Sequence, residues 1–151
     1  MATRYFVLIL GIVFVLIGIM GFVPALVHQN HADPYQLAIE HNHGYLLGIW
    51  PVNSVHNLVH LGSGILGILA FFSLGWARVY CQVLAVVYGA VALIALIPQN
   101  WAKTAFGLMP IHGNDIWLHA VIALAAAYFG WAQVVERRAD LGPADVTSPR
   151  V

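Results

Sequence analysis

The sequence has few charged side chains, and this shortage excludes several classes of protein. Only 8% of the residues are Asp, Glu, Lys or Arg, whereas roughly 25% is usual for a soluble domain. Six basic residues balance six acidic ones, so the chain lacks the basic surface that attracts nucleic acid. Because 61% of the side chains are hydrophobic, we expect the protein to reside in a lipid bilayer.

Cysteine is equally scarce. The single thiol, Cys81, excludes an intramolecular disulfide, and its place within an apolar stretch predicts a buried structural residue. The nucleophile elbow, the P-loop, H-E-x-x-H and C-x-x-C are all missing from the sequence. These absences favour a protein without catalytic activity.

Long apolar stretches are what the sequence has instead. Each is close to the roughly 20 residues needed to cross a hydrocarbon core; the four cover residues 5–27, 51–75, 79–97 and 113–135. Hydrocarbon satisfies no open backbone group, so stretches without alternation are predicted to be helices. The first is too long for a typical signal peptide and is predicted to be retained. We therefore predict an all-α transmembrane four-helix bundle in one domain, residues 1–138, followed by a flexible cytoplasmic tail, residues 139–151.

Basic residues predict the orientation of this bundle. Arg4, Arg78, Arg137 and Arg138 fall at helix ends on one side of the membrane, and only Lys103 falls on the other. Cytoplasmic loops carry an excess of Lys and Arg. The N- and C-termini are therefore predicted to lie in the cytoplasm.

Matching spacings indicate an internal duplication. Arg4 precedes Pro24 by twenty residues, and Arg78 precedes Pro98 by the same twenty. In each half a Gly-x-x-Pro step is followed by a histidine nine residues after the proline: Gly48 to Pro51 with His60, and Gly107 to Pro110 with His119. The fold is therefore predicted to consist of two duplicated helical hairpins, related by an axis along the membrane normal.

The two copies differ in the loop between their helices. Twenty-six residues separate Pro24 from Pro51, but only eleven separate Pro98 from Pro110. The first proline of each pair is predicted to end a helix and the second to begin one. Extra residues in one loop are often functional. Metal binding is one hypothesis for the histidines of the long loop, and simple solvent exposure is the other; they are His28, His31, His41 and His43.

Three histidines and one aspartate are predicted to lie together. His56 and His60 are four residues apart, as are Asp115 and His119, so each pair projects from one face of its helix. The duplication places both pairs at the same depth, below the outer interface. Polar groups at that depth are costly in lipid, so we expect them to face the bundle interior. We call these four residues the His/Asp cluster.

Three hypotheses remain open for the cluster. In the first it joins the hairpins, with Asp115 hydrogen-bonded to His56, His119 or Asn57. In the second its four members bind Zn or Fe, or His60 and His119 are the axial ligands of a haem. In the third it belongs to a proton or ion path, because histidine titrates near neutral pH.

Two motifs also link the chain to a known family. One runs from Gly48 through Pro51 and Asn53 to His56 and His60, and the other from Gly107 through Pro110 and Asp115 to His119. Together with Arg4 and Tyr5, they resemble small bacterial integral membrane proteins known as domain of unknown function 4383, over about residues 4–133. The resemblance implies a four-helix bacterial membrane protein with no established activity. The location that we predict for it is the bacterial inner membrane.

We predict from these observations a non-catalytic accessory, scaffold or assembly protein, whose cluster fixes the packing of helices or of a partner. The expected partners are the lipid bilayer, another membrane protein or a second copy of the chain, and not nucleic acid. A metal- or haem-binding membrane protein is the alternative, with ligands His56, His60, Asp115 and His119. Proton or ion transport is the third candidate.

Overall fold

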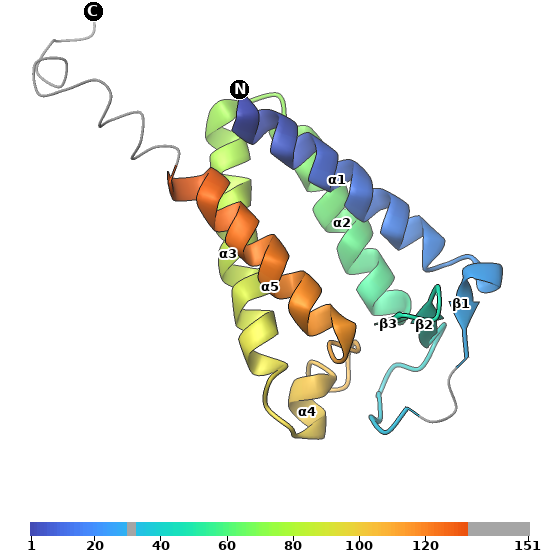
Figure 1. Ribbon diagram of the computed structural model, residues 1–151. Helices are drawn as coiled ribbons and strands as arrows, with labels where there is room; N and C mark the ends of the chain where they lie inside the picture. Colours follow the sequence, from blue (N-terminus) through green and yellow to red (C-terminus); the bar gives the residue numbers. More distant parts are fainter. Residues whose placement is uncertain (30–32, 133–151) are drawn as a thin grey trace, which may run out of the picture.

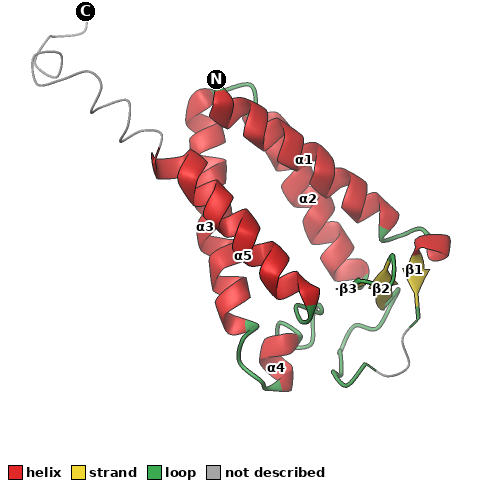
Figure 2. Cartoon of the chain, viewed as in Figure 1, coloured by secondary structure: helices red, strands yellow, loops and turns green. Residues whose placement is uncertain are grey.

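The computed structural model describes residues 1–29 and 33–132, and these are mostly helical (Figures 1 and 2). The long helices of this part of the chain are α1 (Ala2–Met20), α2 (Ser54–Ala70), α3 (Leu74–Ile94) and α5 (Asn114–Ala127). A π-helical turn, Tyr128–Ala132, continues α5. The short helix α4 (Asn100–Lys103) lies between α3 and α5 in the sequence.

The helices are arranged as two pairs. α1 packs chiefly against α2, and α3 packs chiefly against α5. Figure 1 shows the two pairs side by side, with the start of α1 and the turn between α2 and α3 at one end. The strands and α4 lie at the opposite end. The core contains Phe14, Leu84 and Tyr88. Cys81 is completely buried, as predicted.

Glycines bring α1 and α2 into close contact. A Cβ atom added to Gly64 would lie 2.7 Å from the carbonyl oxygen of Gly11, and one added to Gly11 would lie 2.8 Å from the carbonyl oxygen of Gly64. Side chains larger than hydrogen are therefore excluded from this crossing. The same small residues let membrane helices approach closely.

A small antiparallel sheet, which the sequence analysis did not predict, fills the long loop between α1 and α2. Its strands are β1 (Val27–His28), β2 (Gly44–Leu46) and β3 (Trp50–Val52), with β2 in the middle. A 3₁₀ turn, Pro24–Leu26, precedes β1. The strands have only two or three residues, too few to show the alternation that identifies a strand in a sequence.

The prolines at 51 and 110 do not begin helices, so that prediction was wrong. Pro51 belongs to β3, where it is paired with Tyr45 of β2. Helix α2 begins only at Ser54, because the side chain of Asn53 accepts a hydrogen bond from the His56 backbone N–H at 2.9 Å and so caps the helix. Helix α5 likewise begins after Gly113, not at Pro110.

The other helix ends also differ from the limits of the apolar stretches. α1 ends at Met20 and α3 at Ile94, each four residues before the proline that was expected to end it. Residues 133–135 of the fourth stretch and the predicted tail, residues 139–151, lie outside the described residues, as do Arg137 and Arg138.

Much of the outer surface is apolar. Two helices, α1 with 19 residues and α3 with 21, are long and apolar enough to cross a membrane, and α2 is a shorter apolar helix. Their outward side chains are large and exposed, among them Ile9, Leu66 and Val86. A soluble protein rarely exposes contiguous apolar patches larger than a few hundred Å².

Candidate metal centre

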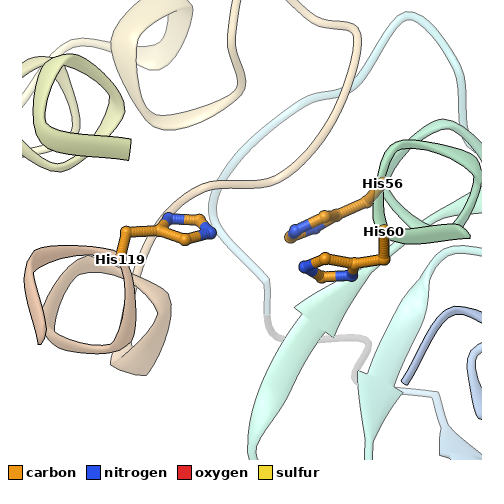
Figure 3. Close-up of side chains that lie close together, drawn as sticks. All are labelled: His56, His60 and His119. Carbon is orange, nitrogen blue, oxygen red and sulfur yellow. The ribbon is translucent and has the colours of Figure 1, made fainter. Parts of the chain in front are cut away.

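The His/Asp cluster lies between the two helix pairs. His56 and His60 are on the first turns of α2, and Asp115 and His119 are on the first turns of α5. All four are buried, with between 3% and 7% of each residue exposed. Figure 3 shows His119 pointing from α5 toward the two histidines of α2. The structure thus brings the four residues of the cluster close together.

The three histidines are close enough to share one ion. One nitrogen from each of His56, His60 and His119 lies within 4.8 Å of the other two. A tetrahedral Zn²⁺ with nitrogen ligands at 2.0–2.1 Å holds these atoms about 3.3 Å apart. The three nitrogens would have to move closer together to bind one ion. A cavity of about 50 Å³ touches all three rings.

Several polar atoms of the cluster have no hydrogen-bond partner. They are Nδ1 of His56, His60 and His119 and Oδ2 of Asp115, all of them buried. A buried polar atom without a partner costs about 1–3 kcal/mol, so four in one place are unusual. Neutral imidazole nitrogen and carboxylate oxygen are common metal ligands, so the side chains gathered here are of the types that bind a metal ion.

Asp115 lies at the edge of the three-histidine group. Its Oδ2 is 3.8 Å from Nδ1 of His56. The backbone carbonyls of Pro51 and Pro110 are polar neighbours of the same imidazole. Carbonyl and carboxylate partners of this kind orient metal-binding histidines in known sites. Asp115 also supplies a negative charge, which a buried divalent cation needs.

Apolar rings surround the cluster on the core side. The ring of Phe14 lies 5.5 Å from that of His60, between centroids, and Tyr88 stands edge-on to His119 at 5.0 Å. These contacts hold both imidazoles in place. Aromatic rings also lower the polarity of this side of the site, which strengthens any electrostatic interaction within it.

A second polar cluster, in the loops, was missed by the sequence analysis. Oδ2 of Asp33 accepts a hydrogen bond of 3.0 Å from the hydroxyl of Tyr45, and it lies 3.4 Å from Nε2 of His43 and 3.5 Å from Nε2 of His112. Burial lowers the pKa of His112, while the carboxylate of Asp33 opposes part of that shift. No pattern in the sequence connects these loop residues.

Two other loop histidines, His28 and His41, join neither cluster. His28 is exposed on β1. Nδ1 of His41 lies 2.6 Å from Oγ of Ser54, the first residue of α2. His31 lies outside the described residues. Of the four, only His43 has a carboxylate neighbour among the residues described.

Two asparagines at the start of α2 also contribute to the site. Nδ2 of Asn53 donates hydrogen bonds to the carbonyls of Ile39 and Leu108, both at 2.8 Å. Nδ2 of Asn57 donates to the carbonyl of Gly21 at 2.7 Å. These bonds attach the α1–α2 loop, the α3–α5 loop and the end of α1 to the helix that carries His56. The N-cap pattern could have identified Asn53 from the sequence.

The chain belongs to the family described as domain of unknown function (DUF4383), whose model matches residues 4–132. No curated protein and no solved structure matched the chain.

Proposed function

We propose that this member of the DUF4383 family is an integral membrane protein that binds a divalent transition-metal ion through His56, His60 and His119. Asp115 would neutralise part of the ion's charge. The observation that carries the proposal is the convergence of three buried histidines, with one nitrogen of each within 4.8 Å of the other two, beside the buried Oδ2 of Asp115, which has no hydrogen-bond partner. Imidazole nitrogen suits Zn, Cu, Fe and Ni, and with Asp115 the set favours Zn or Fe.

The contacts of the cluster favour an ion over the other hypotheses. If the cluster served only to join the hairpins, Oδ2 of Asp115 should be bonded to a neighbour, but it has no partner, and Asn57 is bonded to Gly21 instead. A haem between His60 and His119 would need space that the ring of His56 occupies, 4.6 Å from the ring of His60. The scaffold role and a transport role stay predictions.

The membrane location is part of the same proposal. The apolar exteriors of α1 and α3 support it. Trp76, near the start of α3, and Trp131, after α5, are exposed at one end of the molecule, and Trp101 of α4 is exposed at the other. Aromatic residues gather in this way at the two interfaces of a bilayer. Four spans in the bacterial inner membrane, with cytoplasmic termini, complete the proposed topology.

The proposed bundle consists of two duplicated hairpins. The backbone supports this duplication at the repeated glycines: Gly48 and Gly107 both have positive φ, +73° and +86°. In each copy the preceding residue also has a positive φ, +53° at Leu47 and +62° at Phe106. Two successive left-handed residues are rare outside glycine, so the match at equivalent positions favours a common origin.

The test is a metal analysis of the full chain, purified in detergent with a tag that contains no histidine. We expect about one transition-metal ion per chain, removable by a chelator and restored by Zn²⁺. His119→Ala should abolish binding, whereas the control His28→Ala should bind as the parent does. Circular dichroism of both variants tests for intact folding. A parent that neither contains nor takes up metal, or a His119→Ala variant that binds it equally, would refute the proposal.

A further inference from the structure

An apolar cavity lies directly against the His/Asp cluster. Its volume is about 380 Å³. One wall is formed by α1, through Val13 and Ile17, and the opposite wall by α5, through Leu118 and Ile122. The cavity therefore occupies the space between the two helix pairs.

The cavity has a polar end. Among the described residues that line it, the polar ones are His60, Asp115 and His119; the others are apolar or, like Trp50, aromatic. Each of the three polar side chains is more than nine-tenths buried and has an atom without a hydrogen-bond partner. Small-molecule sites have this form: they are cavities of about 300–1,000 Å³ with apolar walls and a few polar groups that fix the orientation of the ligand.

The cavity is open on the outer side of the helices. Val13 and Leu47 both line it, and yet they are 41% and 43% exposed. Val13 belongs to α1, one of the two helices long and apolar enough to span a membrane. In a bilayer this opening faces lipid, so the occupant would enter from the membrane.

We propose that the cavity binds a long-chain carboxylate from the membrane, with its chain between α1 and α5 and its carboxylate on the metal ion. This inference rests on the proposed function, because it gives the ion held by the three histidines a ligand. The apolar walls match the chain, and the buried polar end matches the head group.

Charge favours a head group with a single negative charge. A divalent ion with three neutral imidazoles and the carboxylate of Asp115 has one positive charge left over. Leaving a charge uncompensated among apolar walls is costly. A single carboxylate cancels it, whereas a neutral alcohol or ester does not and a phosphate dianion adds an excess negative charge.

The test uses a fluorescent polyene fatty acid as the probe. The full chain is reconstituted in phosphatidylcholine nanodiscs, and its metal content is measured before each titration. With Zn²⁺ bound, we expect saturable binding of one probe per chain, at least about tenfold weaker after the metal is removed by a chelator. The methyl ester of the same fatty acid should bind at least about tenfold more weakly than the acid.

Two variants on α5 separate the cavity from the metal site. Leu118→Trp fills the cavity, so it should retain Zn²⁺ and lose probe binding. Val121→Trp adds the same side chain at a position that is 64% exposed and does not line the cavity, and it should bind both ligands as the parent does. These two substitutions differ in little besides the direction of the indole.

Each contrary result has a distinct meaning. A protein that binds Zn²⁺ but not the probe overturns this inference and leaves the proposed function standing. Equal binding of acid and ester, of apo and Zn²⁺ forms, or by Leu118→Trp and the parent, also overturns it. A protein without Zn²⁺ refutes the proposed function itself, and that result appears in the metal analysis before any probe is added.

Discussion

Nδ1 of His56 on α2 lies 3.8 Å from Oδ2 of Asp115 on α5, and neither atom has a hydrogen-bond partner. The two residues come from different helix pairs, so they face each other only because the pairs pack together. The distance exceeds that of a hydrogen bond. It leaves both atoms available to a cation that binds between the helices.

This relationship predicts a specific effect of removing the charge of Asp115. In Asp115→Asn the shape is kept but the ion loses its nearby negative charge, and Zn²⁺ affinity should fall about 10–100-fold, as for other outer partners of metal ligands. Competition with a chelating dye measures the affinity. Asp33→Asn, which alters the loop cluster, is the control and should leave the affinity unchanged. Equal affinities in parent and Asp115→Asn would contradict the assigned role.

A second prediction concerns the cap of α2. Asn53→Ala removes the cap and leaves the carbonyls of Ile39 and Leu108 without their donor. Each buried group without a partner costs about 1–3 kcal/mol and the cap about 1 kcal/mol, so a marked loss of thermal stability in detergent is expected. Ser73→Ala removes the cap of α3, in which Oγ of Ser73 accepts a longer, exposed hydrogen bond of 3.5 Å from the Trp76 backbone N–H. This substitution should lower the free energy of unfolding by less than about 1 kcal/mol. Similar losses in the two variants would contradict this account.

A third prediction tests the contact between α1 and α2. Gly64→Ala forces a Cβ atom against the backbone of Gly11, and overpacking of this kind costs about 1–3 kcal/mol. Gly62 is two residues away on the same helix, and an added Cβ there meets nothing within 4 Å. Gly62→Ala should therefore raise stability by up to about 1 kcal/mol, because alanine favours helix. The melting temperatures of both variants in detergent provide the comparison, and a shift of the same sign in both would count against the close crossing.

The sequence predicted the cluster because helix geometry is local. His56 with His60 and Asp115 with His119 are each four residues apart, and that spacing places a pair on one helix face whatever the rest of the chain does. The repeated distance from proline to histidine then related the two pairs. Neither inference needed knowledge of the loops.

The loops themselves were not predictable in the same way. Asp33, His43 and His112 meet through short strands and turns, and their contacts span up to 79 residues of sequence. No periodic pattern carries such long-range information. The mistaken helix start at Pro51 has a similar origin: proline suits both a first helical turn and a short strand, and the pairing of β3 with β2 decides between them.

The loop cluster yields the last prediction, a dependence of stability on pH. Burial lowers the pKa of His112 in the folded protein, with Asp33 opposing the shift and His43 and Lys103 adding to it. In the unfolded chain the imidazole of His112 takes up a proton near pH 6.5. In the folded protein it takes up a proton only at a lower pH. The unfolded state therefore holds more protons, and stability should fall as the pH drops from about 8 through 6.5 toward 5.

His112→Gln removes this titration and keeps a polar side chain. The parent should lose up to about 1.4 kcal/mol per pH unit more than the variant over that range. Both are measured with a chelator present, so that metal release does not contribute to the difference. His28→Gln, at an exposed position, is the control and should follow the parent. If the parent and His112→Gln lose stability with the same slope, protonation of His112 does not oppose folding. The contacts of Asp33 would then hold the loops independently of the charge on His112.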